Sequence, residues 1–203
     1  MDLMNVFYFL LASVALTLMP GPDILFVATQ SMIQGRKGGM MISLGLCTGL
    51  IAHTVAATIG ISAMVYHSAL AFQILKYSGA AYLLFLAWQS LRNSGSAQLN
   101  QNLSKRSSFS LYKRGIWMNL LNPKVSIFFL AFLPQFVSLQ GSLVSLQLIG
   151  FGILFIIQAL VIFSLVLVGA DYLKKNSYKT LPALEVFTGS KQPSMRFWGF
   201  VWL

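Results

Sequence analysis

Near its N-terminus the chain reads Leu18-Met19-Pro20-Gly21-Pro22-Asp23-Ile24-Leu25-Phe26-Val27, inside an otherwise apolar segment that runs from Leu3 to Gln34. Two prolines and a glycine break a helix here, because proline has no backbone N–H and its ring clashes with the preceding turn. The Asp23 carboxylate follows directly, and a carboxylate at the centre of a bilayer costs about 2.5–3.5 kcal/mol on insertion scales. A broken helix with a charge at membrane depth is typical of a small-molecule transporter, whereas a structural span avoids both features.

The composition indicates a polytopic membrane protein. The chain has 203 residues, of which 57% are hydrophobic and 9% are charged, whereas soluble domains carry about 25% charged residues. The segment from Gly38 to Leu75 contains no Asp, Glu, Lys or Arg, and it is long enough for two spans of about 20 residues each. Cys47 is the single cysteine, which excludes an intramolecular disulfide and cysteine-pair chemistry. We therefore expect an all-α polytopic membrane protein.

The apolar segments predict five clear transmembrane helices. We place them at about 5–30, with the break at 20–22, and at about 39–65, 69–91, 115–137 and 143–170. The first segment carries Asp2 where a signal peptide has Lys or Arg, so we expect it to remain as a span.

Lysine and arginine residues are distributed among the loops in a way that predicts the orientation. They occur in the segments 31–38, 92–114 and 171–180, whereas the loops near 66–68 and 138–141 have none. Cytoplasmic loops carry an excess of Lys and Arg, so we expect these three segments to face the cytoplasm and the N-terminus to lie outside. The net charge of +10 follows from this topology, and we expect no nucleic-acid partner.

Lys124 is a second charge at membrane depth, in the stretch Asn119-Leu120-Leu121-Asn122-Pro123-Lys124. The pair Pro22-Asp23 and the pair Pro123-Lys124 are offset by 101 residues. A repeat unit of three spans is odd, so its second copy enters the membrane inverted, and such repeats place their binding site near the midplane. We expect a single transporter domain with an inverted 3+3 repeat, formed by residues 1–91 and 115–203 around a cytoplasmic loop at 92–114.

The two opposed charges suit a zwitterionic amino acid as substrate. Lys124 would receive the carboxylate of the amino acid and Asp23 its ammonium group. Further polar contacts would come from Asn119, Asn122 and the backbone freed around Gly21, Pro22 and Pro123. Alternatively, Asp23 carries a proton, since burial disfavours its charged form. A third interpretation is a buried Asp23–Lys124 ion pair that fixes the register of the helices.

Three further residues lie four apart in the second span: Gly45, Gly49 and His53. Small residues at this spacing let another helix approach closely, while His53 suits either a proton relay or a hydrogen-bonded packing contact. Asp23 and His53 are too few ligands for a metal exporter, and no nucleophile–base set indicates an enzyme. We expect no metal, no cofactor and no enzymatic activity.

A series of motifs in this order is similar to the LysE/RhtB amino-acid exporter family. The motifs are Pro20-Gly21-Pro22-Asp23, Gly35-Arg36-Lys37-Gly38, Gly45-x-x-x-Gly49-x-x-x-His53, Leu75-Lys76-Tyr77-Ser78-Gly79-Ala80-Ala81-Tyr82-Leu83, Asn119-Leu120-Leu121-Asn122-Pro123-Lys124 and Phe128-Phe129-Leu130-Ala131-Phe132-Leu133-Pro134-Gln135-Phe136. The resemblance covers about residues 5–170. It implies about six spans in the bacterial inner membrane and the export of threonine, homoserine, homoserine lactone or a similar compound, driven by the proton motive force. Its partners would be the amino-acid substrate, protons and the lipid bilayer, and a homo-oligomer is compatible with it.

The C-terminal part departs from the pattern of that family. After about residue 175 only residues 197–203 are continuously apolar, and seven residues cannot cross a bilayer. We therefore expect five clear helices plus a degenerate or truncated sixth, with an aberrant C-terminus from about 175. The alternative functions are a non-transporting remnant or a structural membrane protein, followed by a metal-ion exporter or a membrane enzyme.

Overall fold

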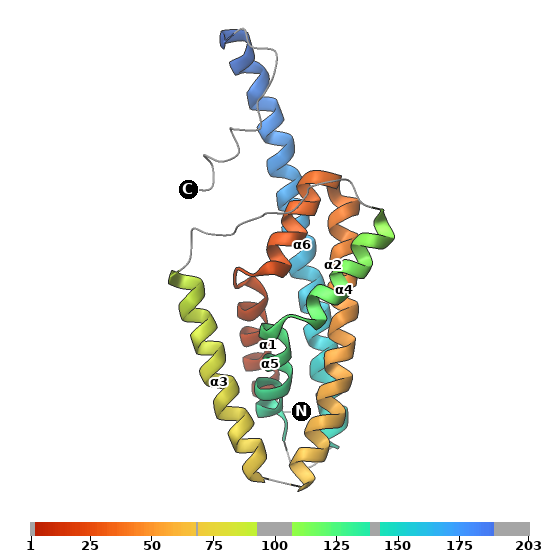
Figure 1. Cartoon of the computed structure of the whole chain (residues 1–203), viewed down its shortest axis with the longest axis vertical. Coiled ribbons are helices and arrows are strands. Elements are labelled where there is room, and N and C mark those ends of the chain that lie inside the picture. Colours follow the sequence, from red (N-terminus) through yellow and green to blue (C-terminus); the bar gives the residue numbers. More distant parts are fainter. Residues whose placement is uncertain (1–2, 68, 93–106, 139–142, 189–203) are drawn as a thin grey trace.

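The computed structural model describes residues 3–67, 69–92, 107–138 and 143–188, except for the side chains at 61–69, 71–72, 90–91 and 175–188. These residues form helices and no strand, as the sequence predicts. The elements are α1 (Leu3–Leu18), α2 (Pro22–His67), α3 (Ala69–Arg92), α4 (Ser108–Leu120), α5 (Pro123–Ile127), the π-helical η1 (Phe128–Phe132), the 3₁₀-helical η2 (Leu133–Phe136) and α6 (Val144–Thr188) (Figure 1).

The first helical rod is broken between α1 and α2 and turns back within α2. In Figure 1 the chain climbs through α1 and the first part of α2, and the remainder of α2 descends to the other end of the bundle. The reversal occurs at Gly35, whose φ of 71° lies in the left-handed region that favours glycine. The first helical rod therefore consists of α1 and the first part of α2, joined across residues 19–21.

The second helical rod is broken between α4 and α5. The α4 helix and the segment Pro123–Phe136 meet at an angle of 51°. Ser107 caps α4 by accepting a hydrogen bond from the Ser110 backbone N–H, a frequent way to begin a helix. The start of α4 at Ser108 is earlier than the predicted start near 115, because Lys113 and Arg114 lie on the helix and not in a loop.

The core of the bundle is aromatic and lies where α1, α6 and the α5–η1 segment meet. Phe9, Phe128, Phe129, Phe151 and Phe155 are all buried there, and the ring centroids of Phe9 and Phe151 are 4.7 Å apart. The rings of η1 and α6 therefore belong to the core and do not face the lipid.

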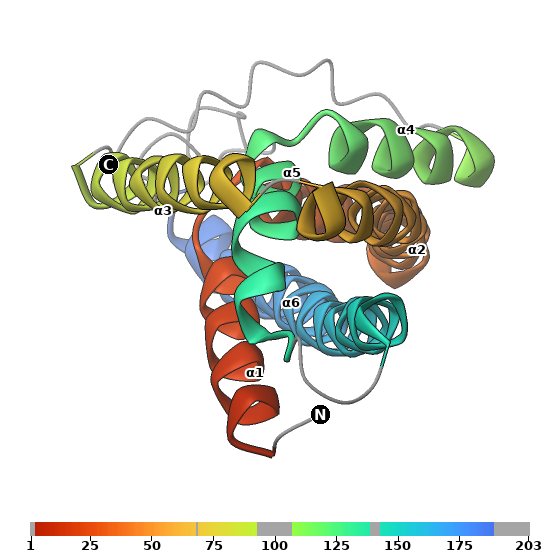
Figure 2. The same cartoon turned by 90° about the horizontal axis from the view of Figure 1, so that it is seen from below.

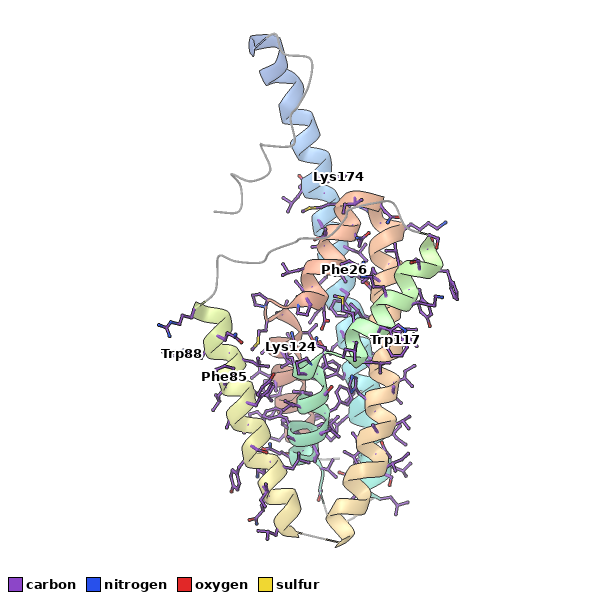
Figure 3. The ribbon with its side chains drawn as sticks, viewed as in Figure 1. Phe26, Phe85, Trp88, Trp117, Lys124 and Lys174 are labelled. Atoms are coloured by element: carbon purple, nitrogen blue, oxygen red, sulfur yellow. The ribbon has the colours of Figure 1, made fainter. Side chains whose placement is uncertain are left out.

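Apolar side chains also cover the outside of the bundle. Trp88 on α3 and Trp117 on α4 are exposed and point away from the bundle (Figure 3). The α3 helix lies at the edge, where it contacts η1, α2 and α5 (Figure 2). Two helical stretches, Pro22–Gly60 and Val144–Lys174, are long and apolar enough to cross a membrane, and the bent α4–α5 pair makes a third. The chain is thus a multi-pass membrane protein.

The count of these stretches is lower than the five predicted spans, and one of the missing spans has a geometric explanation at the N-terminus. The α1 helix has 16 residues, which gives about 24 Å at 1.5 Å per residue, so it crosses about 30 Å of hydrocarbon only together with the first part of α2. At the other end, the backbone of α6 continues as a helix to Thr188 and extends beyond the bundle (Figure 1). Residues 189–203, where the end of the degenerate sixth helix was expected, lie outside the described residues.

Candidate functional site

The two helix breaks face each other in the middle of the bundle and bring Asp23 and Lys124 into one buried site. Asp23 is 5% exposed and Lys124 is 8% exposed. Each is the second residue of its helix, directly after the proline that begins it: Pro22 begins α2 and Pro123 begins α5. Proline suits this position because the first N–H groups of a helix have no intrahelical partner. Figure 3 shows Lys124 at mid-height in the bundle.

Asn122 connects the two breaks through both ends of its amide. Its Oδ1 caps α5 by accepting a hydrogen bond from the Lys124 backbone N–H at 3.0 Å. Its Nδ2 donates to Asp23 Oδ2 at 2.7 Å. A backbone N–H can only donate and a carboxylate accepts, so these two partners fix the orientation of the amide.

The Lys124 ammonium group binds the end of α1. Its Nζ donates to the carbonyl oxygens of Leu16 at 3.0 Å and Met19 at 3.3 Å. The Leu16 carbonyl would normally accept from the residue four positions later, which is Pro20 and has no N–H. The C-terminal end of a helix also carries partial negative charge, which favours a cation there. The broken first rod therefore supplies the binding site for the lysine of the second rod.

Asp23 and Lys124 do not form a direct ion pair. No nitrogen–oxygen distance of 4.0 Å or less joins the two groups, whereas Arg36 Nε and Asp171 Oδ2 lie 2.9 Å apart. Asn122 and the α1 carbonyls hold the two charges instead. The arrangement therefore differs from a buried ion pair that serves only as a brace, because both charged groups keep hydrogen-bonding capacity for another molecule.

A small cavity lies between these charges and α6. Its polar lining consists of Thr17, Asp23, Asn119 and Lys124. Leu50, Phe155, Ala159 and Phe163 belong to its apolar wall. Its free space is about 10 Å³, roughly that of one water molecule. Asp23 Oδ1 and Asn119 Oδ1 are buried without a hydrogen-bond partner, which is uncommon in folded proteins and is often explained by a bound water, ion or ligand.

His53, Gly45 and Gly49 lie along the contact between α2 and α4. The His53 Nε2 atom is 3.2 Å from the Asn119 carbonyl oxygen, and His53 is outside the cavity lining. A Cβ atom on Gly45 would overlap the Tyr112 carbonyl oxygen, and one on Gly49 would lie 2.7 Å from the Asn119 side chain. These three residues thus position the end of α4, which carries Asn119.

Gly21 makes room for the lysine of the second rod. A Cβ atom at this position would lie 3.2 Å from Lys124 Nζ, which is closer than most Cβ contacts. Pro22 and Pro123 are exposed, lie outside the cavity lining and begin α2 and α5.

Two polar contacts that reach α6 were missed in the sequence. Gln158 is 9% exposed and its Nε2 donates to Thr17 Oγ1 at 3.0 Å. Asp171 is buried and accepts from Arg36, which the sequence pattern placed in a loop. The signal for Gln158 was present, because it is the one polar residue in the apolar run 148–163, and isolated polar residues in a span are often functional.

Comparisons with known proteins indicate the family of this chain. The family model of the LysE type translocators matches residues 14–190. The chain is 40% identical over 134 residues to the homoserine/homoserine lactone efflux protein of Salmonella typhimurium, which covers 66% of this chain and 65% of that protein. The protein of the same name from Salmonella typhi is 39% identical over the same shares.

A longer match is found to the uncharacterized membrane protein YrhP of Bacillus subtilis, 31% identical over 169 residues, or 79% of this chain and 80% of that protein. The matches to the two efflux proteins span slightly less than two thirds of those relatives. No solved structure matches the chain. The family match extends over most of the chain and includes both helix breaks, so this chain belongs to the LysE type translocator family.

Proposed function

We propose that this protein exports a small neutral amino acid or a close derivative, such as threonine, homoserine or homoserine lactone. The observation that carries the proposal is the placement of a carboxylate and an ammonium group, without a direct ion pair, on one buried cavity between two broken helices. The family and the names of two relatives support it.

The free hydrogen-bonding groups suit the two ends of an amino acid. The substrate ammonium group binds Asp23 Oδ1 and Asn119 Oδ1, the two acceptors that have no partner. Lys124 uses two of its three N–H groups on α1 carbonyls, and the third donates to the substrate carboxylate.

The size of the cavity requires a conformational change. A free space of about 10 Å³ holds one water molecule and not an amino acid, so the structure corresponds to a closed state. The two breaks, at 19–21 and 121–122, are the places where helix halves can move without rupturing intrahelical hydrogen bonds. In our proposal the chain has five spans and a further C-terminal helix, arranged as an inverted 3+3 repeat. The broken helices of such a repeat open alternately to the two sides of the membrane.

Asp23 couples export to proton entry. A proton and the substrate ammonium group compete for the same carboxylate, so Asp23 carries only one of them at a time. In the outward-open state the carboxylate releases the substrate and takes a proton, and in the inward-open state substrate binding displaces that proton. His53, half-buried and hydrogen-bonded to the Asn119 carbonyl group, is placed to relay protons near the site.

The orientation follows from the end of the bundle that carries the basic segments. The turn within α2 (Figure 1) and Lys174 of α6 (Figure 3) lie at the same end of the bundle, where Arg36 contacts Asp171. We assign this end, with segments 31–38, 92–114 and 171–180, to the cytoplasm and the N-terminus to the outside of the inner membrane. The exposed apolar face of α3 is available to lipid or to a second copy in a homo-oligomer.

The alternative of a non-transporting remnant is not favoured. The family match continues to residue 190, past the point near 175 where the sequence pattern departs from the family. A direct test is export from cells that overproduce the protein: tolerance to toxic homoserine should rise, and labelled homoserine should leave preloaded cells faster. If the protein is inserted and yet none of the twenty amino acids or homoserine leaves faster, the proposal is wrong.

A further inference from the structure

The contact between Thr17 and Gln158 forms a second polar region beside the charged groups. We propose that Thr17 and Gln158 select the substrate by accepting a hydrogen bond from its side chain. This assignment rests on the proposed export function and adds to it the residues that distinguish one neutral amino acid from another.

The orientation of the Gln158 amide is fixed by its partner. The Thr17 hydroxyl group donates to the Ser13 carbonyl oxygen at 2.8 Å, so it can only accept from Gln158. Gln158 Nε2 therefore faces Thr17, at 3.0 Å, and Gln158 Oε1 is left without a partner. The Thr17 oxygen keeps a second lone pair, and Thr17 lines the cavity.

The unpartnered atoms share one chemistry. Within the part of the chain that the structure describes, three buried side-chain atoms lack a hydrogen-bond partner, and all are acceptor oxygens: Asp23 Oδ1, Asn119 Oδ1 and Gln158 Oε1. Asp23 and Asn119 line the cavity, and Gln158, which is not itself part of the lining, is joined to it by its hydrogen bond to Thr17. Each of the three residues is at least nine-tenths buried.

A ligand that satisfies these atoms must donate at two places. An ammonium group meets the acceptors of Asp23 and Asn119, and a hydroxyl group elsewhere on the same molecule meets Gln158 Oε1 and Thr17 Oγ1. The remaining wall is apolar and separates side chains of equal size only weakly. An apolar substrate side chain of the same shape would leave the acceptor atoms of Thr17 and Gln158 without a donor. Such a site rejects the apolar substrate much more strongly than an apolar wall does.

The test compares homoserine with norvaline, which carries a methyl group in place of the hydroxyl group and has nearly the same size. The protein is reconstituted in liposomes, and the initial rates of both labelled amino acids are measured for the wild type and Gln158→Met, which keeps the volume and removes the acceptor. The wild type should prefer homoserine. In the variant the homoserine rate should fall about tenfold while the norvaline rate holds, so the preference is lost.

The matched control is Gln147→Met, because Gln147 is a buried glutamine of the same helix that contacts Ser138 at the other end of the bundle. It should leave the homoserine-to-norvaline ratio unchanged. Should Gln158→Met not insert, Thr17→Val provides the same comparison. An equal loss for both amino acids, or an unchanged ratio, overturns the assignment while export stands. If the wild type transports no amino acid, the proposed function itself fails.

Discussion

The two helix breaks have the same construction and opposite roles. In both, a proline begins the second helix and a charged residue follows it. The break before α5 also contains Asn122, which caps its own helix and then reaches Asp23. The break before α2 has Gly21 at the corresponding position, 101 residues earlier. One break therefore donates hydrogen bonds and the other accepts them, which two identical copies could not do.

The difference between the donating and the accepting break explains how a charged site can be stable in a membrane. Each charge is hydrogen-bonded to neutral groups of the other rod, and no direct ion pair joins the two. A direct pair would have to be separated before a zwitterion could bind, at a cost of several kcal/mol at low dielectric.

Removal of either charge should have the largest effect on export. Asp23→Asn and Lys124→Gln should each lower homoserine export by on the order of 100-fold, since a charge-assisted hydrogen bond to the substrate is lost. The measurement is the initial rate of efflux from preloaded vesicles. Lys37→Gln is the control, because Lys37 is an exposed cation on the same chain. Full activity of Asp23→Asn with unchanged pH dependence would exclude both the binding and the proton role.

Loss of the connecting amide should have the second largest effect. Asn122→Leu removes both the cap of α5 and the bond to Asp23, and should lower the free energy of unfolding by about 2–3 kcal/mol. The thermal midpoint in detergent measures this change. Asn122→Ser keeps a capping oxygen but is too short to reach Asp23, so it should recover part of the stability and little of the export. Equal behaviour of the two variants would contradict the double role of Asn122.

A side chain at Gly21 should have a moderate effect. In Gly21→Ala the new Cβ atom lies 3.2 Å from Lys124 Nζ, and we expect about a fivefold slower export from about 1 kcal/mol of overpacking. Gly60→Ala is the matched control, since no atom lies within 4 Å of its added Cβ. The export rates of the two variants are compared in the same vesicle assay. Equal rates would mean that Lys124 moves aside freely and that the close approach at Gly21 is not needed for export.

The smallest effect is expected away from the breaks, at the ion pair between α2 and α6. Arg36 is 59% exposed on its side chain while Asp171 is 7% exposed. Because solvent screens the exposed partner, Arg36→Gln should change the free energy of unfolding by less than about 1 kcal/mol. The thermal midpoint should move by a few degrees at most. A loss as large as that of Asn122→Leu would show that the contact between Arg36 and Asp171, and not the breaks, holds the bundle together.

The sequence allowed the charged part of the site to be predicted because its signals are local. Proline, charge and amide occur within six residues at 119–124, and the copy at 22–23 identifies the partner. The contact of Gln158 with Thr17 joins residues 141 apart in the chain. Only the packing of α6 against α1 creates it, so no local pattern could predict that pair.

The start of α4 was misplaced for a different physical reason. Lys113 and Arg114 were assigned to a loop by their charge, but both stack on aromatic rings: Lys113 Nζ lies 4.8 Å from the Phe109 ring and the Arg114 guanidinium 4.7 Å from the Phe26 ring. Long basic side chains can lay their stems on apolar surface and remain on a helix. The positions of basic residues are therefore a poor guide to the boundary of a helix.

Pro20 leaves one carbonyl group of α1 without its usual partner. Because proline has no N–H, the Leu16 carbonyl group cannot accept the usual hydrogen bond from within its own helix, and Lys124 donates to it instead. The lysine keeps both α1 carbonyl groups and has a third N–H group for a substrate carboxylate, so binding need not uncover the Leu16 carbonyl group. The break in the first helix is thus completed by a side chain 108 residues away, and any movement that separates the two rods must bring another donor, such as water, to that carbonyl group.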